Sequence, residues 1–113
     1  MPRVPDRGDI YHIDLDPTKG KEQRGGRYVY VLSPAAHNRR GLVVVLPVSQ
    51  GVTLARSTGF AASLSGAGLN AQGVVICDQP RTVDLQARDG RYLESAPAYV
   101  TTDVLTRIAA LVT

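Results

Sequence analysis

The apolar residues of this chain fall into short runs that glycine, proline and asparagine interrupt, and this spacing limits the folds open to it. Leu42–Leu46 and Gly73–Cys77 are continuously apolar, a pattern typical of strands that are buried on both faces. Ile10–Leu15 instead alternates between two faces, as a half-buried strand does. Short strands with turn signals about every eight to twelve residues favour a small twisted sheet or barrel.

Other segments complete this pattern. We predict further strands at Tyr28–Leu32 and Phe60–Leu64, and an extended piece or a short helical turn at Thr82–Leu85. Pro47 should end the strand before it, because proline has no N–H to donate to a sheet ladder. From Pro97 onward the apolar residues follow helical spacing, at Val100, Val104, Leu105, Ile108, Leu111 and Val112. We therefore expect a mainly β (α+β) chain, a small barrel sealed by a C-terminal amphipathic helix.

Length and composition place the chain among folded proteins. Its 113 residues predict one domain over residues 1–113, and 43% hydrophobic content with 20% charge argues against disorder. The net charge of +3 mildly favours an anionic partner. Cys77, the single cysteine, lies in an apolar run and is expected to be a buried, inert thiol in a reducing compartment.

Two further sequence features concern cellular location and the order of the N-terminal residues. The chain shows no signal-peptide pattern and no apolar run near the length of a membrane span. We therefore expect a cytoplasmic protein that does not associate with a membrane. Two prolines in Met1–Arg7 predict a loosely held lead-in.

The segment Asp14–Arg27 is a long polar loop between two apolar runs. From Lys19 to Arg27 it holds four cations and one carboxylate, Glu22. Loops of this length in a small domain are often functional, and arginine side chains match phosphate oxygens with a rigid fork of donors. A solvated hairpin loop is the alternative.

Polar residues gather in three segments that each lie at a predicted strand end. These are Lys21–Arg27, Ser49–Arg56 and Asp78–Arg81. If the sheet curls so that the ends meet, they form a shallow basic groove, which suits a flexible chain of phosphates. The nearest aromatic stacking candidates, which can equally be core residues, are Tyr28, Tyr30 and Phe60.

Few kinds of chemistry fit these residues. Ser49 lacks the glycine context of a nucleophilic serine, and neither zinc-ligand spacing nor a phosphate-binding glycine loop is present in the sequence. Cleavage of RNA by its own 2′-hydroxyl needs neither a metal nor a protein nucleophile, only alignment, charge neutralisation and proton transfer. Arg27 is a candidate to clamp the phosphate by charge, Ser49 to hydrogen-bond it, and Glu22 to orient groups or transfer a proton.

Several different short motifs are spread along nearly the whole chain at specific separations. They include Arg7-Gly8-Asp9-Ile10, Leu15-Asp16-Pro17-Thr18, Gly20-Lys21-Glu22-Gln23, Gly26-Arg27, Ser33-Pro34-Ala35-Ala36, Val44-Val45-Leu46-Pro47-Val48 and Cys77-Asp78-Gln79-Pro80-Arg81. In this combination the chain resembles the MazF/PemK (Kid) family of toxins, and most of all its PemK/Kid branch.

This resemblance implies a fold, an activity and partners. The fold would be an SH3-like β-barrel of the CcdB/PemK type, in a homodimer. The activity would be that of a metal-free endoribonuclease without cofactors, which cuts single-stranded RNA at short sequences and leaves a 2′,3′-cyclic phosphate and a 5′-hydroxyl. A cognate MazE/PemI-like antitoxin would neutralise the enzyme by laying a segment over the RNA site, and operator DNA would be bound only through that complex.

The resemblance also assigns roles to residues. The essential arginine of MazF-type enzymes falls on Arg27, the active-site threonine on Ser49 and the glutamate of the same loop on Glu22. The aspartate proposed as a base in PemK/Kid falls on Asp78. We expect RNA contacts from Asp78 and from Lys21, Gln23, Gln50, Arg56, Phe60, Gln79 and Arg81.

The chain departs from the family pattern at three positions. Lys21 and Ile76 stand where PemK/Kid members have a histidine and an arginine, which argues that Arg27 and Ser49 carry the chemistry. Lysine cannot shuttle protons near neutral pH unless its pKa is strongly lowered. Tyr28 stands where the family has proline, and either loosens the loop or adds a stacking ring.

Two other functions compete with cleavage. A CcdB-like poison would bind a partner protein and cut nothing, but that route relies on an aromatic near the C-terminus, and this chain ends Leu111-Val112-Thr113 and has no tryptophan. An SH3-like RNA-binding module with a degraded site is the second alternative.

Overall fold

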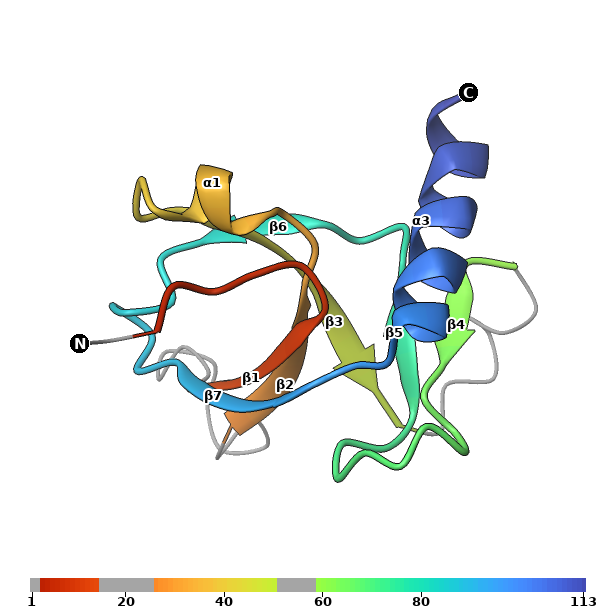
Figure 1. The fold of residues 1–113 in the computed structure, drawn as a ribbon, viewed down its shortest axis with the longest axis horizontal. Helices are drawn as coiled ribbons and strands as arrows, with labels where there is room; N and C mark the ends of the chain where they lie inside the picture. The colour runs from red at the N-terminus through yellow and green to blue at the C-terminus, as the bar shows by residue number, and fades with distance from the viewer. Residues whose placement is uncertain (1–2, 15–25, 51–58) are drawn as a thin grey trace, which may run out of the picture.

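The computed structural model describes residues 3–14, 26–50 and 59–113, and these contain a curled antiparallel sheet with a helix at its C-terminal end (Figure 1). The strands are β1 (Asp9–Asp14), β2 (Gly26–Val31), β3 (Val43–Ser49), β4 (Ala61–Ser63), β5 (Val74–Ile76), β6 (Arg81–Val83) and β7 (Arg91–Ser95). The helices are α1 (Ala35–Asn38) and α3 (Ala98–Val112). The expectation of a mainly β chain with a C-terminal helix is confirmed.

Strand β3 organises the sheet. The strand order is β4-β5-β3-β2-β1-β7, with β6 also paired to β3, and all pairings are antiparallel. One edge of β3 pairs with β2, while the other pairs first with β6, from Val43 to Val45, and then with β5, at Val48 and Ser49. Because β3 changes partner along its length, the sheet bends around it.

The prediction that Pro47 ends a strand is wrong, because β3 continues through it to Ser49. Pro47 lies opposite Val29 of β2. On the other edge, pairing with β6 ends at Val45 and pairing with β5 begins at Val48. The proline therefore falls in the gap between two partner strands, where a residue without an N–H is tolerated.

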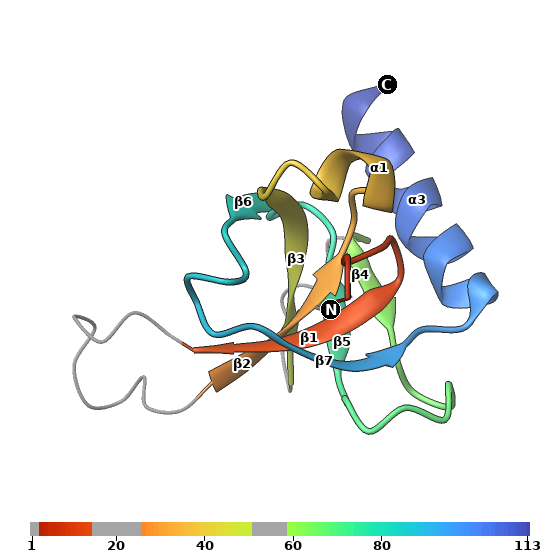
Figure 2. The same cartoon turned by 60° about the vertical axis from the view of Figure 1, so that its left-hand side comes forward.

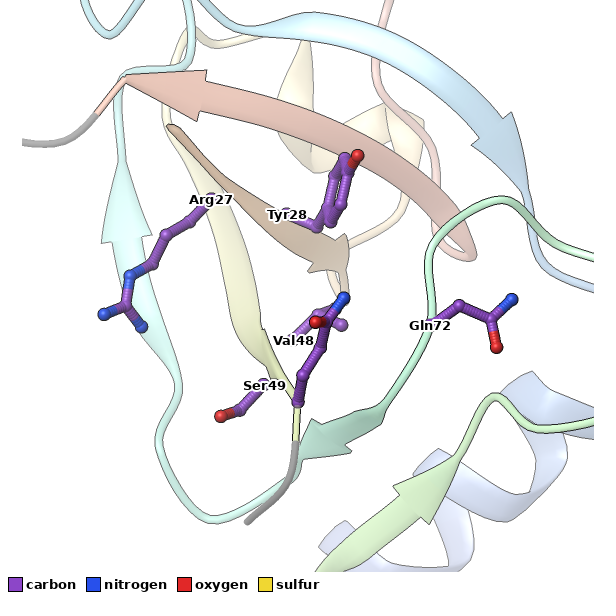
Figure 3. A pocket seen from close by; sticks show the side chains of 6 residues that line it. Arg27, Tyr28, Val48, Ser49 and Gln72 are labelled. Atoms are coloured by element: carbon purple, nitrogen blue, oxygen red, sulfur yellow. The ribbon is translucent and has the colours of Figure 1, made fainter. Parts of the chain in front are cut away.

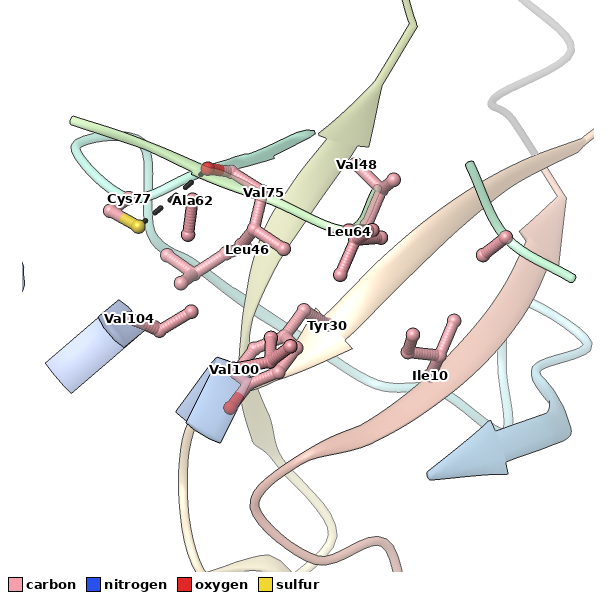
Figure 4. Close-up of a cluster of buried hydrophobic side chains, with 11 residues drawn as sticks. Ile10, Tyr30, Leu46, Val48, Ala62, Leu64, Val75, Cys77, Val100 and Val104 are labelled. Atoms are coloured by element: carbon pink, nitrogen blue, oxygen red, sulfur yellow. Dashed lines mark hydrogen bonds between the residues drawn. The ribbon is translucent and has the colours of Figure 1, made fainter. Parts of the chain in front are cut away.

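Apolar side chains pack on both faces of the central strands. One cluster includes Ile10, Tyr30 and Leu46 and is closed by Val100 and Val104 of α3 (Figure 4). The opposite cluster is formed by Tyr11, Ile13, Val29, Val31, Val43, Val45, Val83 and Leu85. The first half of β1 is therefore buried on both faces rather than one. The predicted two-faced burial of Leu42–Leu46 is confirmed for Val43, Val45 and Leu46 of β3 but is wrong for Leu42, which precedes the strand and is 52% exposed.

Helix α3 begins directly after Pro97, as its sequence predicts, and lies beside β4 (Figures 1 and 2). Its docking is fixed by buried Val100 and Val104 and by a hydrogen bond of 2.6 Å between the Tyr30 hydroxyl and Thr101 Oγ1. Within the described ranges, none of the helices is long and apolar enough to cross a membrane.

The predicted loose lead-in is wrong for its described part. Arg3 Nε and Nη2 donate to the Asp9 carboxylate at 3.1 and 3.0 Å, and Asp6 N donates to it at 3.0 Å. The Arg3 guanidinium also lies 4.0 Å from the centre of the Tyr92 ring. Asp9 is only 2% exposed, so these contacts tie the N-terminal segment to β1 and β7.

Candidate active site

Arg27 and Ser49 lie near the neighbouring ends of β2 and β3, and both line one pocket. The last pair between the two strands is Val29 with Pro47, and Arg27 and Ser49 each lie two residues beyond it on their own strand. Side chains two residues apart on a strand share a face, so both project from the face that carries Val29 and Pro47. The two principal catalytic candidates are thus brought together.

A pocket of about 340 Å³ surrounds the ends of these strands. Its lining residues are Arg27, Tyr28, Val48, Ser49, Gln50 and Gln72 (Figure 3). Arg27 and Ser49 extend to one side of the β2–β3 pair and Tyr28 to the other, so the pocket wraps around the strand ends. The lining therefore combines a cation and a hydroxyl on one side of the strands with an aromatic ring on the other, and it also includes Gln50 and Gln72.

The Tyr28 ring is held in place by contacts with the core and with β1. The half-buried ring packs against the core cluster of Ile10, Tyr30 and Leu46. On β1 the ring of His12 meets it edge-on, with centroids 5.5 Å apart and planes at 70°. The sequence alternatives for Tyr28 were a loosened loop or an added ring, and these contacts favour a fixed ring that lines the pocket.

Gly73 brings a further segment against Ser49. Its φ is +110°, and a Cβ there would overlap the Ser49 carbonyl oxygen and lie 3.2 Å from Gln50 Cα. Only glycine allows this close approach. The next residue, Val74, pairs with Ser49 between β5 and β3. Gln72, immediately before this glycine, was missed by sequence reasoning, and its position beside Gly73 is the only signal that could have pointed to it.

Other predicted site residues lie elsewhere. Asp78 and Gln79 are exposed in the turn between β5 and β6, and Arg81 begins β6 opposite Val45. Phe60 is half-buried against the first core cluster. None of these four lines the described pocket. Four further predicted residues lie outside the described ranges and stay predictions, namely Lys21, Glu22, Gln23 and Arg56.

The predicted inert thiol is confirmed by its surroundings. Cys77 is 1% exposed, and burial raises the pKa of its thiol to about 11. Because the thiolate is the reactive form, this group is poorly suited to nucleophilic chemistry near neutral pH. Ile76, beside it, is also buried on β5. The polar chemistry of the described site thus comes from β2, β3 and the segment before β5.

Comparison with known proteins finds relatives that all belong to one family. Residues 6–112 match the family described as PemK-like, MazF-like toxin of type II toxin-antitoxin system. The chain is 49% identical over 109 residues to "Endoribonuclease PemK" of Escherichia coli, covering 96% of this chain and 82% of that protein. It is 36% identical over 86 residues to "Endoribonuclease toxin MazF" of E. coli K12, covering 75% and 73%.

A solved structure shares the fold. The crystal structure of MazE-MazF (Form-II) from Deinococcus radiodurans superposes with a TM-score of 0.84 at 34% identity, covering 98% of this chain and 97% of that one. The family match spans nearly all of the chain, and the greater identity to PemK than to MazF agrees with the PemK/Kid resemblance of the motifs. This chain therefore belongs to the family of PemK-like, MazF-like toxins of type II toxin–antitoxin systems.

Proposed function

We propose that this protein is an endoribonuclease toxin that cleaves single-stranded RNA, including mRNA, without a metal ion. The observation that carries the proposal is that Arg27 and Ser49 line one pocket. Relatives that cover most of the chain are named endoribonucleases, which supports the same reaction class.

In the proposed reaction the RNA 2′-oxygen attacks the adjacent phosphorus. The 2′-O–P bond forms and the P–O5′ bond breaks, giving a 2′,3′-cyclic phosphate and a 5′-hydroxyl. The Arg27 guanidinium donates to the non-bridging oxygens, where negative charge grows, and the Ser49 hydroxyl donates to the same phosphate. Since arginine stays protonated, Arg27 acts by charge stabilisation.

Proton transfer needs further groups. The 2′-hydroxyl proton must leave and the 5′-oxygen must gain a proton. We assign one of these transfers, or the orientation of the reacting groups, to Glu22, and keep Asp78 as a candidate base or RNA contact. Asp78 is exposed in the turn after β5 and does not line the described pocket, so its contact would be with RNA that extends beyond the pocket.

The rest of the pocket suits a nucleotide base. An aromatic face such as that of Tyr28 stacks with unpaired bases, and carboxamides such as those of Gln50 and Gln72 pair with base edges. Single-stranded RNA presents both features, because its bases are free of a partner strand. We therefore propose that Arg27 and Ser49 hold the scissile phosphate while Tyr28 and the carboxamides hold a flanking base.

We also propose the partners that the family suggests. The solved MazE-MazF complexes support a MazE/PemI-like antitoxin for this chain, with operator DNA bound through that complex alone. Exposed apolar side chains of α3, namely Leu105, Leu111 and Val112, together with Tyr99, support a homodimer. A single domain over residues 1–113 and a cytoplasmic location complete the proposal.

Incubation of the purified protein with single-stranded RNA in excess EDTA tests the function. We expect cleavage with cyclic-phosphate ends, and a loss of orders of magnitude in Arg27→Ala and Ser49→Ala while the fold is retained. Arg39→Ala, which removes an exposed arginine at the end of α1, is the matched control. RNA binding without cleavage would instead favour the degraded binding module, and neither binding nor cleavage would favour a CcdB-like poison.

A further inference from the structure

We propose that Glu94 is a positioning residue that holds the segment Asn70–Gly73 as one wall of the pocket. It does not line the pocket, and it acts through the backbone of this wall segment. The inference rests on the proposed function for its effect on RNA, but its structural part stands on the contacts alone.

Both carboxylate oxygens of Glu94 bind the wall segment. Oε1 accepts the N–H of Asn70 at 2.9 Å, and Oε2 accepts the N–H of Ala71 at 2.8 Å. Hydrogen bonds to an ionised acceptor are stronger than neutral ones, and two consecutive donors on one carboxylate fix both position and direction. The bonds link β7 to a loop 23 and 24 residues away in sequence.

The wall segment is short and anchored on its other side. Ala71 is fully buried in the core cluster, and the Gln72 side-chain Nε2 donates to the Leu69 carbonyl at 2.8 Å. Gln72 lines the pocket, and Gly73 lies against the Ser49 carbonyl. A single residue thus separates the amide that Glu94 holds from the glycine that contacts Ser49.

This arrangement predicts an effect on binding rather than on the chemical step. Arg27 is held by its pairing with Ile13 of β1 and Ser49 by its pairing with Val74 of β5, and neither pairing uses the Asn70 and Ala71 amides that Glu94 binds. A loosened wall therefore weakens the hold on RNA but leaves the catalytic pair in place. An interaction made equally in the ground state and the transition state changes KM and not kcat.

Glu94→Gln tests the bracing, because the amide keeps the shape but can accept only one of the two N–H groups. Asp84→Asn is the matched control, since Asp84 Oδ1 also accepts a backbone N–H, that of Ala87 at 3.0 Å, in a turn after β6. In Glu94→Gln we expect amide hydrogen exchange at Asn70 and Ala71 to rise at least tenfold. The amide resonances of Ser49 and Gln50 should also shift, whereas Asp84→Asn should leave all four unchanged.

Cleavage kinetics test the functional part. We expect Glu94→Gln to raise KM for single-stranded RNA about five- to tenfold, with kcat within twofold of the wild type. Gln72→Ala should raise KM as well, and the double variant should be little worse than either single variant, because both act through one wall. Additive losses, or a fall in kcat alone, would overturn the proposal.

The outcomes separate the two hypotheses. Unchanged exchange at Asn70 and Ala71 would show that Glu94 does not hold the wall, whatever the protein does to RNA. Faster exchange with an unchanged KM would show that the wall does not set the pocket. If the wild-type protein cuts no RNA, the proposed function fails, while the exchange and resonance measurements still decide the role of Glu94.

Discussion

Replacing Gly73 with alanine tests the fold and the candidate site together. A Cβ at this position would overlap the Ser49 carbonyl oxygen and lie 3.0 Å from the carbonyl carbon. These are backbone atoms, which cannot rotate away as the end of a flexible side chain can. Either the end of β3 or the segment before β5 must therefore move, and both carry residues that line the pocket.

Two costs add at this position. Alanine at positive φ costs about 1–2 kcal/mol, and forced backbone shifts in a packed region cost about 1–3 kcal/mol more. Gly68 is the matched control, because its φ is also positive, at +75°, but a Cβ there would meet nothing within 4 Å. Gly68→Ala should therefore show the first cost alone.

Urea unfolding followed by circular dichroism measures both variants. We expect Gly73→Ala to lose about 2–5 kcal/mol in the free energy of unfolding, which lowers the melting temperature by roughly 10 °C or more. Its RNA cleavage, measured well below the melting temperature, should also fall because Ser49 is displaced. Equal stability losses in the two variants, or full cleavage by Gly73→Ala, would refute the close contact or its link to the site.

Three further predictions concern charge, burial and pH. Arg27→Lys keeps the positive charge but loses the paired N–H donors of the guanidinium, so kcat for RNA cleavage should fall about 10²-fold. A fall of less than threefold would contradict bidentate binding of the phosphate by Arg27. Asp9→Asn weakens a buried acceptor of several hydrogen bonds and should cost about 2–3 kcal/mol in urea unfolding. Burial raises the pKa of Cys77 in the folded state to about 11, from 9.0, so its contribution to stability is complete below pH 9 and is lost as pH rises toward 11. The stability of the wild type should therefore fall more than that of Cys77→Ala between pH 8 and about 10, and parallel curves would contradict this.

The buried strands were predictable because a run of consecutive apolar residues indicates burial on both faces. Val43–Leu46 and Val74–Ile76 are apolar throughout, so they can be recognised without knowledge of their partners. Strand β7 went unpredicted because Arg91–Ser95 is mostly exposed and forms the edge of the sheet beside β1. Its position comes from pairing with residues far away in sequence, which leaves no periodic signal in its own residues.

The site shows the same division. The motifs around Arg27 and Ser49 named the candidates, but their presence in one pocket depends on strand β3 continuing past Pro47, where the sequence pattern predicts its end. Gln72 carries no motif, and it enters the pocket because Gly73 allows its segment to lie against Ser49. Close approach of two backbones is a tertiary property, and a lone glycine in the sequence indicates only that such an approach is permitted.

The buried position of Ile76 bears on which residues carry the chemistry. In the PemK/Kid pattern an arginine at this position would serve the site, whereas here the side chain is 5% exposed, in a strand that pairs with β4. A charged side chain in this environment would need a partner that offsets its desolvation, while isoleucine gains from burial. The position thus contributes to the core, and positive charge for a phosphate must come from elsewhere. Arg27 is the cation that lines the described pocket, so the departure at position 76 makes the proposed mechanism depend more heavily on Arg27.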